Sequence, residues 1–118
     1  MADAYARLTG FGVALATSGP GATNFCTPIA ASYYDSIPVL YLTGNQTVRR
    51  MNAMGTRQYG FQATPIVDMV KHITKDAVTV LDKENVMEIL DEAVRIAKSG
   101  RPGPVLVDIP DDVQRASL

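Results

Sequence analysis

The sequence predicts an α/β fold in three layers, in which a mostly parallel sheet is flanked by helices. Short apolar runs at residues 13–16, 37–42, 77–81 and 105–109 have the length and composition of strands buried on both faces. Helical or irregular segments separate these runs. Such alternation favours parallel strands joined by right-handed crossovers.

The chain has 118 residues, which is enough for one domain with its own core and too few for two. Eleven basic residues against twelve acidic ones give a formal net charge of -1. The composition therefore does not favour binding to nucleic acid or to an anionic membrane surface. Small molecules or proteins are the expected partners.

The cysteine and histidine content limits the chemistry further. Cys26 is the single cysteine and His72 the single histidine, so the sequence predicts neither an internal disulfide nor a Cys/His metal site. No apolar run approaches the roughly 20 residues of a membrane span. Residues 1–7 also lack the pattern of a signal peptide. These features predict a cytoplasmic protein.

The amino-terminal third contains the first helix, strand and turn. Residues 1–8 predict a helix that ends at Gly10, and because no N-cap residue precedes it we expect its beginning to be missing. The strand at 13–16 leads to a glycine turn at 18–21.

The helix after this turn is expected to start at Thr23 or Asn24 and to continue to residue 34. Pro28 conflicts with that start, because proline inside a helix costs roughly 3 kcal/mol or more. Either the helix kinks at Pro28, or its regular part begins near Thr27.

The second half predicts a loop and two helices. Residues 45–60 are irregular and indicate a long loop, a feature that is usually functional or mobile. Thr64 is expected to cap a short helix, with Pro65 at its first position, that ends near His72. Asp82 is expected to cap an amphipathic helix at 83–98.

The glycine turn, Ser18-Gly19-Pro20-Gly21, is the first candidate site. It lacks the Lys-Ser/Thr pair of a nucleotide P-loop and the third glycine of a dinucleotide fold. Spacing alone therefore leaves two interpretations open, a phosphate cradle or a plain tight turn between strand and helix, of which we favour the plain turn.

The remaining polar residues give no catalytic constellation. Ser18 and Cys26 lack an evident activating base, and His72 is interpreted as a surface or capping residue. The carboxylates that follow the last strand are interpreted as solvated turn residues. Two arginines in the loop could bind an anionic group or pair with a neighbouring subunit. The carboxylates are Asp108, Asp111 and Asp112, and the arginines are Arg49 and Arg50.

Several motifs together identify a family. They occur in the family's order at residues 1–10, 16–24, 34–39, 42–44, 49–51, 61–62, 64–65 and 100–110. On these residues the chain resembles the pyrimidine-binding domain of thiamine diphosphate enzymes. Within that group it is most similar to the catalytic subunit of acetolactate synthase and its relatives.

The resemblance implies roles for named residues. Thr17, Pro20, Asn24 and Gln62 would bind the aminopyrimidine end of thiamine diphosphate. A second set would lie along the substrate channel or the loop beside it. This set is Arg49, Arg50, Met51 and Phe61.

The resemblance also implies what lies outside the chain. The family's catalytic glutamate would precede Met1, and the central and diphosphate-binding domains would be absent. Magnesium, and FAD where it is used, would belong to the full-length enzyme. We therefore expect a partial domain that is inactive alone, marginally stable and prone to associate. Two stretches of the loop, Gly44 to Val48 and Met54 to Gly60, depart from the commoner pattern, which leaves the acceptor substrate open.

The leading hypothesis is thus part of a homo-oligomeric enzyme of branched-chain amino acid biosynthesis, which decarboxylates a 2-keto acid and joins the product to an acceptor. One alternative is another thiamine diphosphate enzyme, such as a 2-keto acid decarboxylase or oxidase. A second is a non-catalytic dimerisation or binding module, and a weaker third is a free-standing phosphate or nucleotide binder.

Overall fold

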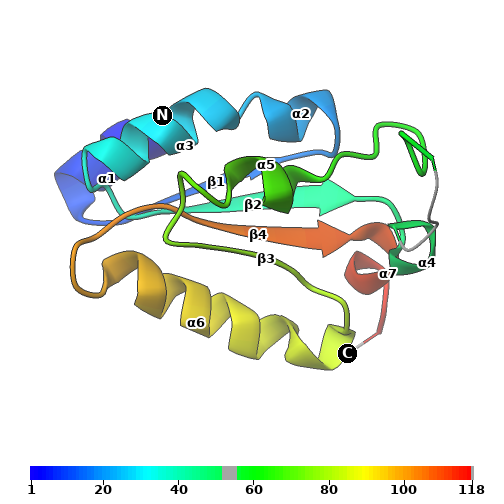
Figure 1. Cartoon of the computed structure of the whole chain (residues 1–118). Coiled ribbons are helices and arrows are strands. Elements are labelled where there is room, and N and C mark those ends of the chain that lie inside the picture. The colour runs from blue at the N-terminus through cyan, green and yellow to red at the C-terminus, as the bar shows by residue number, and fades with distance from the viewer. Residues whose placement is uncertain (52–55, 118) are drawn as a thin grey trace.

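A single parallel sheet forms the middle of the molecule in the computed structural model, which describes residues 1–51 and 56–117. Its strand order is β1-β2-β4-β3, and every neighbouring pair is parallel. The strands are β1 (Gly12–Ala16), β2 (Val39–Asn45), β3 (Asp76–Thr79) and β4 (Val105–Pro110). The predicted α/β fold with a parallel sheet is confirmed (Figure 1).

Helices cover both faces of this sheet, which gives the predicted three layers (Figure 1). One face packs against α1 (Ala2–Thr9), α2 (Pro20–Thr23), α3 (Cys26–Tyr34) and α5 (Ile66–Val70). The other packs against α6 (Val86–Lys98) and α7 (Asp111–Gln114). A 3-10 turn, η1 (Lys83–Asn85), precedes α6, and α4 (Val48–Met51) follows β2.

The central strands are apolar at consecutive positions because each face has its own core. Leu106 of β4 belongs to the cluster under α1, α3 and α5, whereas Val105 and Val107 belong to the cluster under α6. All three side chains are fully buried. Burial on both faces is the physical reason for the continuous apolar runs in the sequence.

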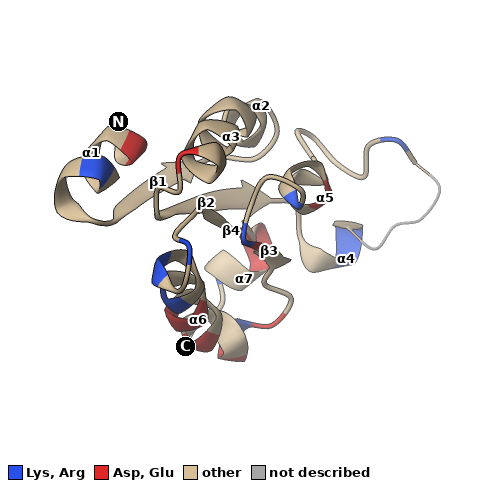
Figure 2. Ribbon diagram, turned by 60° about the vertical axis from the view of Figure 1, so that its left-hand side comes forward, with Lys and Arg blue, Asp and Glu red and all other residues tan. Residues whose placement is uncertain are grey.

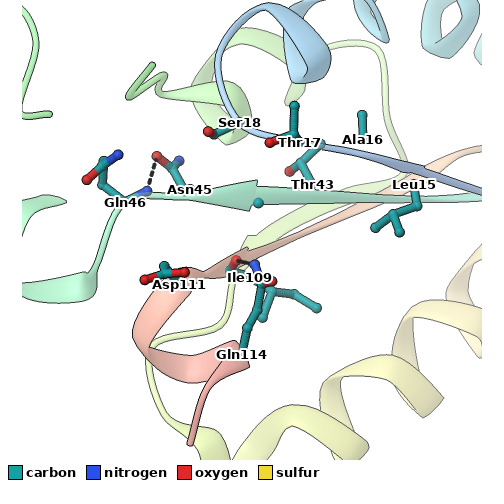
Figure 3. A pocket seen from close by; sticks show the side chains of 11 residues that line it. Leu15, Ala16, Thr17, Ser18, Thr43, Asn45, Gln46, Ile109, Asp111 and Gln114 are labelled. Atoms are coloured by element: carbon teal, nitrogen blue, oxygen red, sulfur yellow. Dashed lines mark hydrogen bonds between the residues drawn. The ribbon is translucent and has the colours of Figure 1, made fainter. Parts of the chain in front are cut away.

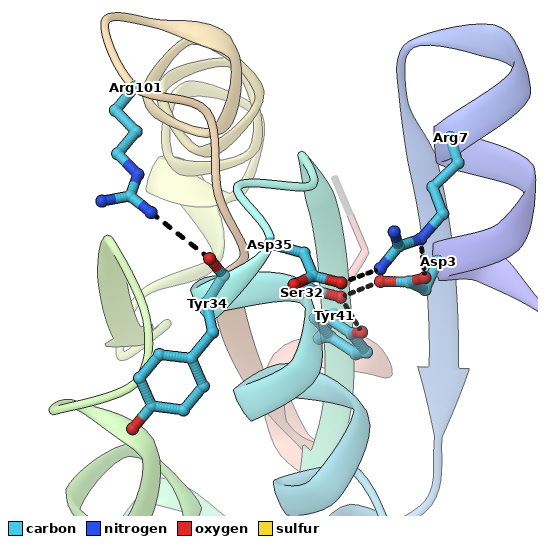
Figure 4. Close-up of polar contacts among 7 residues, drawn as sticks. All are labelled: Asp3, Arg7, Ser32, Tyr34, Asp35, Tyr41 and Arg101. Carbon is cyan, nitrogen blue, oxygen red and sulfur yellow. Dashed lines mark hydrogen bonds and ion pairs between the residues drawn. The ribbon is translucent and has the colours of Figure 1, made fainter.

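Polar contacts join α1 to α3 (Figure 4). Arg7 donates to Asp3 at 2.7 Å and also pairs with Asp35. Ser32, which is fully buried, donates to Asp3 at 2.8 Å and lies 3.0 Å from the hydroxyl of Tyr41 on β2. These contacts fix α1 at the edge of the sheet, and the left-handed Gly10 (φ 89°) ends it as expected.

The helix after the glycine turn does not start at Thr23 or Asn24, as the sequence predicts. A one-turn helix begins at Pro20, directly after Gly19, and the longer helix starts at Cys26. Pro28 is therefore the third residue of α3. Its missing N–H falls in the first turn, where backbone donors have no partner within the helix, so no kink is needed.

Three other boundaries differ from the sequence prediction. The expected loop at 45–60 begins as the end of β2 and then forms α4, while its residues 52–55, including Met54, lie outside the described part. Pro65 takes the N-cap position of α5 in place of Thr64, whose carbonyl instead accepts hydrogen bonds. The Asp82 side chain accepts a hydrogen bond from Glu84 N and so acts as the predicted cap, but the turn that it caps, η1, is a 3-10 turn.

One edge of the sheet carries exposed apolar side chains. β1 is an edge strand, and Leu15 on it is 79% exposed, while Leu8 on the adjacent α1 is 87% exposed. Figure 2 shows the acidic residues of α6 ahead of the basic ones at its end, and no charged residue along β1. Within residues 1–51 and 56–117, no helix has the length and apolar character needed to cross a membrane.

Candidate functional site

A cavity of about 610 Å³ opens at the carboxyl ends of β1, β2 and β4 (Figure 3). Ligands of open α/β sheets bind at this end of the strands, because the loops that follow the strands converge there. The lining residues come from the ends of three strands and from α7. They are Leu15, Ala16, Thr17, Ser18, Thr43, Gly44, Asn45, Gln46, Ile109, Asp111 and Gln114.

The glycine turn begins at this cavity, which its first residue, Ser18, lines. Gly19 has a positive φ (61°, with ψ −120°), and a Cβ added there would lie 2.7 Å from Cβ of Gln62 and 2.8 Å from the Gln62 carbonyl oxygen. Glycine is therefore required both by the backbone conformation and by the contact. The fold thus brings together two motifs that are far apart in the sequence.

Gln62 itself has an unusual backbone, with φ at 57°. Residues other than glycine rarely adopt a left-handed conformation, because their Cβ crowds the backbone. Strained residues of this kind cluster at functional sites. The segment at 60–63 forms a tight turn, in which Ala63 N donates to the Gly60 carbonyl at 3.1 Å. The neighbouring Phe61 side chain is 79% exposed.

Gln46 connects three parts of the site, although it was not among the site residues predicted from the sequence. Its Nε2 donates to the Phe61 carbonyl at 2.7 Å, and its Oε1 accepts from Nη1 of Arg50 at 3.0 Å. Its backbone N–H donates to Oδ1 of Asn45 at 2.9 Å (Figure 3). The position of Asn45 and Gln46, just beyond an apolar strand, was the available signal for both.

The prediction made for Asp108 is wrong. Together with Asp111 and Asp112 it was interpreted as a solvated turn residue, but it lies within β4 and is 1% exposed. Its carboxylate accepts from Thr43 Oγ1 at 2.7 Å and from Asn45 Nδ2 at 2.8 Å. Burial raises the pKa of Asp108 above its ordinary value, although both hydrogen bonds act against this.

The other two carboxylates belong to α7, which the sequence prediction lacked. Asp111 is at the cavity and pairs with Arg115 at 2.8 Å. The Asp112 carboxylate accepts from Val48 N at 3.1 Å and so joins α7 to α4. Asp112 is exposed, as expected for a turn residue, while Asp111 is half-buried.

The predicted cofactor residues are distributed unevenly around the cavity. Thr17 lines it, and Gln62 contacts Gly19 beside it. Pro20 and Asn24 are exposed at the two ends of α2, outside the residues that line this cavity. Their role in binding the pyrimidine stays a prediction.

The predicted channel residues lie on the loop side. Arg50 contacts Gln46, and Met51 lines a second cavity of about 340 Å³ together with Asn45, Tyr59 and Asp108. Burial also raises the pKa of Tyr59. Arg49 is exposed at the start of α4.

The remaining candidates lie apart from the cavity or have no activating partner. His72 is exposed between α5 and β3, in agreement with its interpretation as a surface residue. Cys26 is half-buried at the start of α3, and Ser18 lines the cavity, in which the structure places no histidine. Within the described residues, no group of three or more His, Cys, Asp or Glu side chains could hold a metal ion.

Comparison with known proteins assigns the class. Residues 1–73 match the family described as "Thiamine pyrophosphate enzyme, N-terminal TPP binding domain", and this chain belongs to that family. Over 115 residues it is 50% identical to "Acetolactate synthase 2, chloroplastic" of Nicotiana tabacum and 49% identical to "Acetolactate synthase, chloroplastic" of Arabidopsis thaliana. These alignments cover 97% of this chain and 17% and 16% of the respective relatives. The chain thus spans about one sixth of their length.

Proposed function

We propose that the chain forms the aminopyrimidine side of a thiamine diphosphate site in an acetolactate synthase-like enzyme. That enzyme would decarboxylate a 2-keto acid such as pyruvate and join the product to an acceptor. The single observation that carries the proposal is the contact of Gln62 with Gly19, which directly follows Ser18, a residue that lines the cavity. Family membership and the acetolactate synthase names of the relatives support it.

The side chains around the cavity fit an aminopyrimidine better than a phosphate. Hydroxyls and amides supply both donors and acceptors, as an exocyclic amine and ring nitrogens require. Among the described lining residues, Asp111 is the one charged group, and it is an acid. This lining offers an anion no basic side chain, so the diphosphate, magnesium and any FAD would bind elsewhere in a longer protein.

The residues would divide the work between cofactor and substrate. Thr17, Pro20, Asn24 and Gln62 would contact the pyrimidine. Arg50, Met51 and Phe61 would border the substrate channel. Bound thiamine diphosphate would supply the carbon that takes up the decarboxylated fragment, and the protein would orient it and exclude water.

The test compares three ligands by following backbone amide signals in two-dimensional NMR. Thiamine and thiamine diphosphate should shift the signals of Thr17, Gly19 and Gln62 in the same way. Inorganic diphosphate should leave them unchanged, because no cation lines the described cavity. Equal shifts with diphosphate alone, or no shift with thiamine, would contradict the proposal.

The proposal extends to assembly and compartment. The acetolactate synthase-like enzyme would be a homo-oligomer. A reducing compartment such as the cytoplasm is inferred from the single Cys26, whereas the names of the plant relatives place those proteins in the chloroplast. Fractionation of cells with an antibody to the chain tests the compartment.

A second candidate function is a module for self-association. Exposed apolar side chains on α1 and β1, including Leu8 and Leu15, favour it. Such a module would form dimers without responding to thiamine. The NMR titration therefore separates the two candidates.

A further inference from the structure

We propose that Asp108 is a positioning residue that fixes the segment 61–64, and with it Gln62, against the glycine turn. The inference rests on the proposed function, because Gln62 is one of the residues expected at the pyrimidine. Asp108 would act through Asn45 and Gln46 and would not touch the cofactor itself.

The first step is the orientation of the Asn45 amide. Asp108 and Thr43 are register partners on β4 and β2, and Asn45 lies two residues further along β2, on the same face. A carboxylate only accepts hydrogen bonds, so it must face the NH₂ group of Asn45. This fixes which end of the amide points in which direction.

The second step carries that orientation to the loop. With Nδ2 turned toward Asp108, the same nitrogen also donates to the Thr64 carbonyl at 2.9 Å. Oδ1 then faces the other way and accepts from Gln46 N at 2.9 Å. A flipped amide would place an oxygen against both the carboxylate and the carbonyl, and would lose all three bonds.

The third step concerns the segment itself. Gln46 Nε2 holds the Phe61 carbonyl and Asn45 Nδ2 holds the Thr64 carbonyl, so both ends of the segment 61–64 are attached to the end of β2. Gln62 lies between these attachments in its left-handed conformation. Strained backbone persists only where surrounding contacts hold it in place.

A purely structural role for Asp108 is the competing explanation. Joining β2 to β4 needs only the bond from Thr43, since the strands already share a parallel ladder at this point. The bond to Asn45 leads out of the sheet to the loop. The two roles therefore separate when the two bonds are broken one at a time.

The experiment measures amide hydrogen exchange on the whole chain without ligand. Asp108→Ala and Asn45→Asp should each speed exchange at Ala63 and Ile66 by about tenfold more than at β4, the change expected for one lost hydrogen bond of ordinary strength. Thr43→Val, the control, breaks the other bond of the same carboxylate. It should speed exchange in β2 and β4 without singling out the loop.

The double variant Asp108→Asn, Asn45→Asp guards against a single variant that fails to fold. It restores a donor and an acceptor between the two positions but leaves the Thr64 carbonyl without its amide donor. Its β4 exchange should return toward that of the unmodified chain while Ile66 stays fast. The positioning role would be overturned if every variant sped amide exchange equally at all positions, or if exchange at Ala63 and Ile66 did not change.

The ligand titration distinguishes a failure of this inference from a failure of the proposed function. An unmodified chain that ignores thiamine overturns the proposed function whatever the exchange data show. If thiamine shifts Gln62 in the unmodified chain, Asp108→Ala should weaken that response by about tenfold or more, while Thr43→Val should weaken it less. Equal losses in both variants would also overturn the inference.

Discussion

At the scale of single residues, Gly19 and Gln62 are each constrained by the other. Gly19 needs its positive φ and leaves no room for a Cβ, while Gln62 adopts a conformation that non-glycine residues disfavour. Two such residues in contact, beside the cavity at the carboxyl ends of the strands, distinguish this turn from the other turns within residues 1–51 and 56–117.

Replacing Gly19 by alanine tests this contact. Gly19→Ala should destabilise the fold by about 1–3 kcal/mol for the positive-φ backbone that is sparsely populated outside glycine, and by about 1–3 kcal/mol more for the displacement of Gln62. Gly100→Ala is the matched control, because Gly100 has a similar φ of 55° and nothing within 4 Å of an added Cβ. Urea unfolding measures both variants, and equal losses would contradict the expectation.

Asp108 should make stability depend on pH with a definite sign. Burial raises its pKa above the ordinary 3.8, so just above pH 3.8 the folded chain holds a proton that the unfolded chain has released. The contribution of the Asp108 carboxyl group to the free energy of unfolding is therefore present at low pH and declines as the pH rises through the raised pKa. The pKa of Asp3 is lowered, chiefly by its hydrogen bond from Arg7, and has the opposite effect.

Comparison with Asp108→Asn isolates the effect, since both chains contain Asp3. The free energy of unfolding of the unmodified chain, minus that of the variant, should decrease as the pH rises from 4 toward 7. Urea titrations at a series of pH values measure this difference. A difference that stays constant would show that Asp108 titrates normally.

At the scale of elements, α1 depends on the buried hydroxyl of Ser32. This hydroxyl donates to Asp3 on α1 and contacts the Tyr41 hydroxyl on β2, so it joins three elements (Figure 4). Tyr41 is 1% exposed, and burial raises the pKa of its phenol. The exposed ion pair between Arg7 and Asp35 contributes less, because water screens it.

Ser32→Ala should therefore lower the free energy of unfolding by about 1–3 kcal/mol, the cost of leaving buried polar groups without a partner. Ser117→Ala removes the same hydroxyl from an exposed position and should change it by less than about 0.5 kcal/mol. Thermal unfolding followed by circular dichroism compares the two. Similar midpoints would contradict a specific role for Ser32.

Element boundaries show where local patterns give the correct structure. The strand at 105–109 and the helix at 83–98 were predicted within a few residues, because burial on both faces and helical amphipathicity are local signals. Thr64 was wrongly assigned as a cap: the helical bonds begin with Met69 N to the Pro65 carbonyl, and the Thr64 carbonyl accepts from Asn45 of another element. No local pattern records such a contact.

At the scale of the whole molecule, the exposed edge formed by α1 and β1 has consequences for association. Leu8 and Leu15 are exposed there, and β1 pairs on only one side within the described sheet. Open edges with apolar side chains promote pairing between chains. This agrees in direction with the expected tendency to associate.

A charged residue at this edge should weaken self-association. Leu8→Lys should raise the concentration at which dimers or larger species form, by about tenfold or more if Leu8 is buried at the contact. Leu81→Lys, at a 63% exposed leucine beyond β3, should change it little. Sedimentation velocity over a concentration series measures both, and equal effects would exclude the α1 edge as the contact.

The sequence by itself determined the alternation of helices and strands, the parallel sheet and the family, because these depend on local periodicity and on motifs in a fixed order. Only the tertiary structure decided that Asp108 is buried and that Gln46 holds the loop. It also decided that Gly19 meets Gln62. Each of these depends on which distant segments come together at one end of the sheet, and periodicity within a segment carries no information about its neighbours in space.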